Sequence, residues 1–253
     1  MKKKIAIYIP AYNASRTIAQ VLDRIPEEVK KEVVEIFVVD NASSDDTYMT
    51  VMDYKRRNGM DNLHIIKNER NLGYGGSQKF AYDYAIKKGF DIIVMLHGDA
   101  QYAPEFLPKI LEPIRRGEAD MVFGSRMSEN PLKGGMPIWK FIGNRLLTWF
   151  ENLVLGTQLS EFHSGYRAYN CRVLEKIPFH RCSDNYYFDT EIIVQAHIAG
   201  LRISETPIPT HYGGRSMSPS HSELLDYSIH IVISMLAYWL HKKGLRKYRI
   251  YEF

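Results

Sequence analysis

The chain has 253 residues, 45% of them hydrophobic, which suits one large α/β domain with a substantial core. Its net charge of +4 is too small to indicate a nucleic-acid partner, and its two cysteines indicate neither a zinc site nor a disulfide framework. The apolar run near the N-terminus is too short for a signal peptide, and no run of about 18 apolar residues predicts a transmembrane helix.

Short apolar runs alternate with helix-forming segments over the first half of the chain. Strands are predicted over residues 5–9, 33–39, 63–67, 92–96 and 121–123, with helices between them. We expect Asn13 or Ser15 to cap the first helix, and Asp45 and Asp46 to lie at the start of the second. This alternation predicts a mainly parallel sheet with helices on both faces.

Acidic residues follow two of these runs, because Asp40 ends the second and Asp99 lies just after the fourth. Ligands of open α/β sheets bind at the carboxyl ends of strands, where carboxylates hold a hard cation or accept hydrogen bonds from a base or ribose. The alternative for Asp40 is a cap on the next helix. No phosphate loop or dinucleotide motif follows the first strand, which disfavours an NTPase or dehydrogenase.

The second half is less regular, with helices predicted over 139–155, 184–199 and 223–243 and a strand-like segment over 201–208. Arg126, Arg167 and Arg215 are expected near phosphates because each lies in a loop that contains Gly and Ser. The last helix, followed by basic residues over 242–249, resembles an in-plane membrane anchor. The alternative is a helix that packs in a dimer or between domains.

Five motifs occur in the order seen in family-2 glycosyltransferases, and the chain resembles the branch that includes dolichyl-phosphate mannose and glucose synthases. The resemblance implies a GT-A fold over 1–217, with a nucleotide-sugar half (1–126) and an acceptor half (127–217), before a C-terminal amphipathic helix and basic tail (218–253). The motifs are Pro10-Ala-Tyr-Asn13, residues 38–47, residues 71–76, Gly98-Asp-Ala-Gln101 with Pro104, and Gly124-Ser-Arg126.

The resemblance also implies which residues bind the donor and a Mg²⁺ or Mn²⁺ ion. Asp40 would bond the base or ribose, and Asp99 would be the metal-binding acid of a DxD-type motif, with Gln101 nearby. The remaining residues expected to line the donor site are Pro10, Ala11, Tyr12, Asn13, Asn41, Gly73, Gly75, Gly98 and Arg215.

Two positions depart from the family pattern. Ala14 stands where the family usually has an acid, and His97 stands at the first acid of the DxD-type motif. His97 is either a further metal ligand or a packed, hydrogen-bonded histidine.

The expected reaction is inverting transfer from a UDP- or GDP-sugar. A saccharide hydroxyl as acceptor needs a general base, for which Asp189 and Glu191 are the candidates. A polyprenyl or dolichyl phosphate needs cations instead, such as Arg167, Arg215 and His211.

A cytoplasmic enzyme, peripheral at the cytoplasmic face of the membrane, is expected. A nucleotidyltransferase and a non-catalytic nucleotide-sugar-binding protein are the alternatives from other classes. The sequence leaves the sugar and the base open, and it allows a homo-oligomer.

Overall fold

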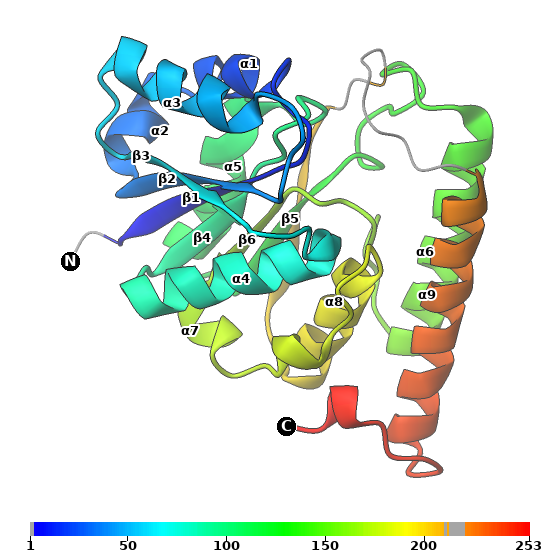
Figure 1. Ribbon diagram of the computed structural model, residues 1–253. Coiled ribbons are helices and arrows are strands. Elements are labelled where there is room, and N and C mark those ends of the chain that lie inside the picture. Colours follow the sequence, from blue (N-terminus) through cyan, green and yellow to red (C-terminus); the bar gives the residue numbers. More distant parts are fainter. Residues whose placement is uncertain (1–2, 210–211, 213–220) are drawn as a thin grey trace.

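A seven-stranded sheet in the order β3-β2-β1-β4-β6-β5-β7 forms the centre of the molecule (Figure 1). The structure is a computed structural model, and it describes residues 3–209, 212 and 221–253. All pairings are parallel except those of β6 with β4 and β5. The predicted α/β class with a mainly parallel sheet is confirmed. The strands are β1 (Ile5–Ala11), β2 (Glu35–Asp40), β3 (Leu63–Lys67), β4 (Ile92–Met95), β5 (Met121–Ser125), β6 (Arg167–Asn170) and β7 (Ile203–Pro207).

Helices cover both faces of this sheet and bury an apolar cluster on each (Figure 1). One face carries α4 (Gly73–Lys88), α7 (Cys171–Leu174) and α8 (Phe188–Ile198). The opposite face carries α1 (Ile18–Asp23), α2 (Glu27–Glu32), α3 (Thr47–Asn58) and α5 (Leu107–Arg115). Two long helices, α6 (Ile138–Leu155) and α9 (His221–Lys242), pack against each other at one side of the molecule.

The structure differs from the expected local elements at four places. Residues 163–167 were expected to form a loop, but Arg167 begins β6, a four-residue strand too short to show a periodic pattern. The helix predicted from residue 184 begins only at Phe188, and the short α2 was not predicted. Neither Asn13 nor Ser15 caps α1, because its N-cap is Thr17, which makes no side-chain cap bond.

The strand ends of β1, β2 and β4 lie side by side, and each is followed by a non-glycine residue in the left-handed region. These residues are Asn13, Ala42 and Ala100, with φ of 50°, 62° and 61°. An alanine there costs about 1 kcal/mol or more, and such strain clusters at functional sites. This edge of the sheet is therefore the candidate site. Strands β6 and β7 of the expected acceptor half share the same sheet, and the division into domains stays a prediction.

Candidate active site

Backbone amides of the loop after β1 bond to side chains that follow β2, one in the next loop and one at the start of α3. The Asn13 amide donates to Ser43 Oγ at 2.9 Å, and the Ala14 amide donates to Thr47 Oγ1 at 2.8 Å. The Ala14 methyl is buried in the apolar cluster, so the acid usual in the family would meet apolar surroundings at this position. Tyr12, just before these anchored residues, remains 41% exposed, as a base-stacking surface requires.

Asp40 has one carboxylate oxygen without a partner. Its Oδ1 accepts from the Ser43 amide at 2.9 Å, whereas its buried Oδ2 accepts no hydrogen bond from the described residues. The N-cap of α3 is Asp46, so the alternative in which Asp40 caps that helix is wrong. An unpaired buried acceptor costs about 1–3 kcal/mol, and a hydroxyl or amine donor at this edge would offset that cost.

Asn41, Gly73 and Gly75 have structural contacts of their own. Asn41 Nδ2 donates to Asn71 Oδ1 at 2.8 Å, which ties β2 to the loop before α4. A Cβ on Gly75 would lie 2.3 Å from the Ser183 carbonyl oxygen, and a Cβ on Gly73 would meet the next carbonyl at 2.4 Å. These glycines therefore allow the start of α4 to pack against the segment before α8, and their predicted contact with a donor stays a prediction.

Asp99 lies on a tightly packed turn at the end of β4. A Cβ on Gly98 would lie only 3.1 Å from the Pro10 carbonyl oxygen, which brings this turn close to β1. Asp99 Oδ1 accepts from the Gln101 amide at 3.0 Å, and Asp99 Oδ2 makes no hydrogen bond to the described residues.

The described residues include no group of three or more His, Cys, Asp or Glu that could hold a metal ion. Asp99 therefore fits a divalent cation that takes most of its ligands from substrate phosphates and water.

His97 faces the interior of the protein. Its Nε2 atom lies 3.5 Å from Tyr74 Oη, and a Cβ on Gly165 would come within 2.4 Å of it. Its ring packs edge-on against Tyr102. Burial lowers the pKa of His97 despite the charges of Asp99 and Asp189, so the ring is neutral near pH 7. These contacts favour the packed interpretation over a metal ligand.

The two candidate bases on α8 have different surroundings. Asp189 accepts from Tyr74 Oη at 2.9 Å and from Gln78 Nε2 at 3.2 Å, so both of its oxygens are bonded beside His97. Glu191 instead accepts from the Ser183 amide at 2.6 Å, and burial raises its pKa to about 7. Only Asp189 adjoins His97, Tyr74 and Tyr102, which we call the His97 cluster.

Arg167 is fully buried and bonded to backbone carbonyls. It donates to the carbonyls of Phe162, Ser164 and Asp189 at 2.9, 2.7 and 2.8 Å. Its Nη1 also lies 3.5 Å from Asp189 Oδ1. These bonds hold the segment before β6 against α8, and the predicted contact of Arg167 with a phosphate stays a prediction.

Arg126 forms a buried ion pair with Glu161 and donates to the His163 carbonyl at 2.9 Å. Burial opposes ionisation, but the charge of Arg126 holds the pKa of Glu161 below its ordinary value. A buried guanidinium needs such a counter-charge. The charge of Arg126 is therefore neutralised by Glu161 and is not free for a phosphate, contrary to the expectation from the sequence. Arg215 and His211, the other predicted phosphate-binding residues, lie outside the described residues.

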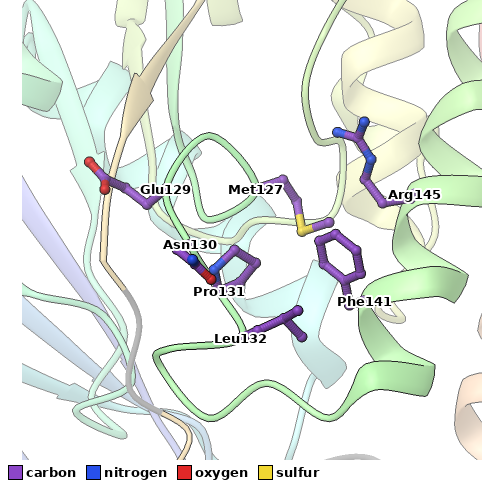
Figure 2. A pocket seen from close by; sticks show the side chains of 7 residues that line it. All are labelled: Met127, Glu129, Asn130, Pro131, Leu132, Phe141 and Arg145. Carbon is purple, nitrogen blue, oxygen red and sulfur yellow. The ribbon is translucent and has the colours of Figure 1, made fainter.

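A cavity of about 380 Å³ opens between the loop after β5 and α6 (Figure 2). It is lined by Met127, Glu129, Asn130, Pro131, Leu132, Phe141 and Arg145. Arg145 is exposed and makes no ion pair or hydrogen bond with the described residues. Arg145 was not among the predicted site residues, although it is one of two basic residues in the apolar run of α6. The four apolar side chains and the guanidinium suit an amphipathic anion, although the Glu129 carboxylate also lines the cavity.

Several known proteins resemble this chain in sequence or in architecture. The family model described as glycosyl transferase family 2 matches residues 6–178. The UDP-N-acetylglucosamine–dolichyl-phosphate N-acetylglucosaminyltransferase of Methanococcus voltae is 28% identical over 92% of this chain and 96% of its own. The undecaprenyl-phosphate mannosyltransferase of Micrococcus luteus is 27% identical over 81% of this chain and 82% of its own.

A solved structure with a similar fold is glucosyl-3-phosphoglycerate synthase from Mycobacterium tuberculosis, in complex with Mn²⁺, uridine diphosphate and glucosyl-3-phosphoglycerate. Its TM-score is 0.68 at 19% sequence identity, and the match covers 93% of this chain and 80% of that one. At this identity the likeness supports the fold alone.

Proposed function

Because the chain belongs to glycosyltransferase family 2, we propose that it is an inverting, metal-dependent enzyme that moves a sugar from a UDP- or GDP-sugar to a polyprenyl phosphate. Family membership and the GT-A fold make it a glycosyltransferase, which leaves the nucleotidyltransferase and the non-catalytic binding protein without support. The relatives named for transfer to dolichyl or undecaprenyl phosphate support the acceptor class.

The donor would lie across the ends of β1, β2 and β4. Tyr12 would face the base, and Asp40 would accept a hydrogen bond through its unpaired oxygen. Asp99 would hold the divalent cation, which when bound offsets the negative charge that grows on the leaving diphosphate. The solved neighbour, which shares the fold, is in complex with Mn²⁺ and uridine diphosphate, and the proposed cation and donor are of the same kind.

The cavity beside Arg145 carries the proposal of a lipid phosphate acceptor. Met127, Leu132 and Phe141 offer apolar contact for isoprenoid carbon, and Arg145 offers a charged donor for the phosphate. A phosphate is already an anion and needs no general base. The bonded state of both Asp189 oxygens is consistent with that chemistry. Because the acceptor is anchored in lipid, we place the enzyme at the cytoplasmic face of the membrane.

Radiolabelled UDP- and GDP-sugars test the acceptor. With polyprenyl phosphate we expect an organic-extractable, acid-labile product that requires Mg²⁺ or Mn²⁺. Label found only in water-soluble glycan would establish the saccharide alternative instead.

Two substitutions test the site with matched controls. Asp99→Asn should lower kcat by about a thousandfold with unchanged thermal stability, while the exposed Asp61→Asn leaves activity unchanged. Arg145→Gln should raise KM for the lipid by about tenfold or more without affecting donor binding, in contrast to Arg56→Gln on α3. Full activity of the Asp99 variant would remove Asp99 from the site.

A further inference from the structure

Helix α6 has polar side chains on its buried side and large apolar side chains on its exposed side. Asn144, Thr148 and Glu151 are at most 8% exposed, although they are the type of residue that a surface helix usually turns to solvent. The large apolar side chains at helical spacing on the outer side are 50% to 66% exposed: Ile138, Trp139, Ile142, Leu146, Trp149 and Leu153. Leu147, Phe150 and Leu155 pack inward as well, so α6 is apolar on both sides, unlike a helix whose outer side faces water.

The inner polar side chains are paired with the loop before β6. Asn144 Nδ2 donates to Glu161 Oε1 at 3.0 Å. His163 Nε2 lies 2.9 Å from Glu151 Oε2, close enough for an ion pair when the ring is protonated, although neither atom makes a hydrogen bond with the described residues. These contacts fix the rotation of α6 about its axis. The apolar outer side therefore cannot turn inward without breaking buried polar contacts.

Helix α9 extends the same surface. It packs beside α6 (Figure 1) and turns Ile231, Met235 and Tyr238 inward. Its exposed large apolar side chains are Leu225, Ile229, Val232, Ile233, Leu236 and Trp239. With the six of α6 they form what we call the α6–α9 face, which holds all three tryptophans of the chain. So many large apolar side chains exceed the scattered ones of ordinary soluble surfaces.

The segment Leu224–Lys242 of α9 is long and apolar enough to cross a membrane by length and composition. However, Tyr251 Oη donates to the Ser234 carbonyl at 3.0 Å, and α9 also packs against α6 and α8. Crossing a bilayer would break these contacts, so α9 suits a position in the plane of the membrane.

We propose that the α6–α9 face docks into the interfacial layer of an anionic lipid bilayer. Tryptophan favours the boundary between headgroups and hydrocarbon, and exposed cations attract anionic headgroups. The only acid of α6, Glu151, is buried. Exposed basic side chains border the face at Arg145 on α6, at Lys242 at the end of α9, and at Lys243, Arg246 and Lys247 just after it.

This docking would set the cavity beside Arg145 at the level of lipid headgroups. Phe141 and Arg145 line that cavity from α6 itself (Figure 2). A polyprenyl phosphate could then enter without leaving the lipid. This delivery step rests on the proposed function, whereas the docking surface does not.

Intrinsic fluorescence tests the docking, because every tryptophan of the chain lies on the α6–α9 face. The full chain is mixed with phosphatidylcholine vesicles that contain about 30% phosphatidylglycerol, some carrying brominated lipid. We expect co-sedimentation, a blue shift and quenching, each weakened by salt. Vesicles of phosphatidylcholine alone should bind less protein.

The double variant Leu146→Ser/Leu153→Ser should lower vesicle affinity by about tenfold or more, because both side chains are exposed and lie on the face. The matched control is Val34→Ser/Met49→Ser, which changes two side chains of similar exposure elsewhere and should bind as the parent does.

Absence of both co-sedimentation and quenching overturns the proposal. A dimer would also overturn it. If light scattering shows a dimer of the parent chain, if the Leu146→Ser/Leu153→Ser variant is a monomer, and if the parent does not bind vesicles, then a second copy of the chain covers the face. Activity on a short, water-soluble polyprenyl phosphate separates the two proposals. Vesicle binding without any such activity refutes the proposed function and leaves the docking intact.

Discussion

Replacing Glu191 with glutamine should change how the stability of the protein depends on pH. Glu191 is only 8% exposed, and its Oε2 accepts from the Ser183 amide at 2.6 Å. Burial raises its pKa from 4.5 to about 7, despite that bond and the charge of Lys79. The bonded segment packs directly against Gly75 at the start of α4. Glu191 thus holds a wall of the candidate active site in place and lies outside the His97 cluster.

The magnitude follows from the shifted pKa. Between pH 4.5 and about 7 the folded protein keeps a proton that the unfolded chain has lost. The free energy of unfolding therefore falls as the pH rises through this window and is constant, with respect to this group, above it. At roughly 1.4 kcal/mol per pH unit the loss is about 3 kcal/mol.

Urea denaturation of wild type and Glu191→Gln from about pH 4.5 to about pH 8 measures this effect. The variant does not titrate at this position, so its stability relative to wild type should rise by about 3 kcal/mol across the series. The exposed Glu118→Gln should differ from wild type by no more than about 0.5 kcal/mol throughout. A difference between Glu191→Gln and wild type that stays constant with pH would refute the argument from burial.

Three further predictions concern the interior of the site and its metal. Gly165→Ala would set a Cβ 2.4 Å from His97 Nε2 and 2.8 Å from Tyr74 Oη, so kcat/KM should fall about tenfold or more. Gly143→Ala, whose Cβ meets nothing within 4 Å, should leave kcat/KM unchanged and gain up to about 1 kcal/mol of stability. Arg167→Lys cannot bond three carbonyls in the same geometry and should lose about 2–4 kcal/mol in urea denaturation, and an unchanged midpoint would contradict this account. Removal of divalent cations with a chelator should abolish turnover, and Mg²⁺ or Mn²⁺ should restore it, whereas full activity in the chelator would show that Asp99 needs no metal.

The strands of the N-terminal half could be predicted from the sequence because their signals are local. Apolar runs of strand length, each followed by a helical segment, determine a parallel α/β sheet without knowledge of distant residues. The positions of Asp40 and Asp99 at strand ends followed from the same pattern. Asp40 ends β2 and Asp99 lies in the turn after β4, and β1 pairs with both of these strands.

The partners of the buried charges depended on packing between segments far apart in the chain. Arg126 and Arg167 look alike in the sequence, as arginines near glycine and serine, yet Glu161 and Asp189 neutralise them. No periodic pattern encodes which acid a buried guanidinium meets. The same holds for Glu191, whose position two residues after Asp189 did not show that it points away from the His97 cluster.

The sequence by itself determined the class of fold, the strand ends and the family-like motifs, because these depend on residue types at short spacing. Only the tertiary structure decided which side of α6 is buried. The apolar residues of this helix lie on both of its sides, since Leu147 packs inward while Ile142 and Leu146 face outward. The reason is that Asn144 of α6 bonds Glu161 in the loop after the helix, and Arg126 of the loop after β5 holds that same carboxylate, which fixes the rotation of α6.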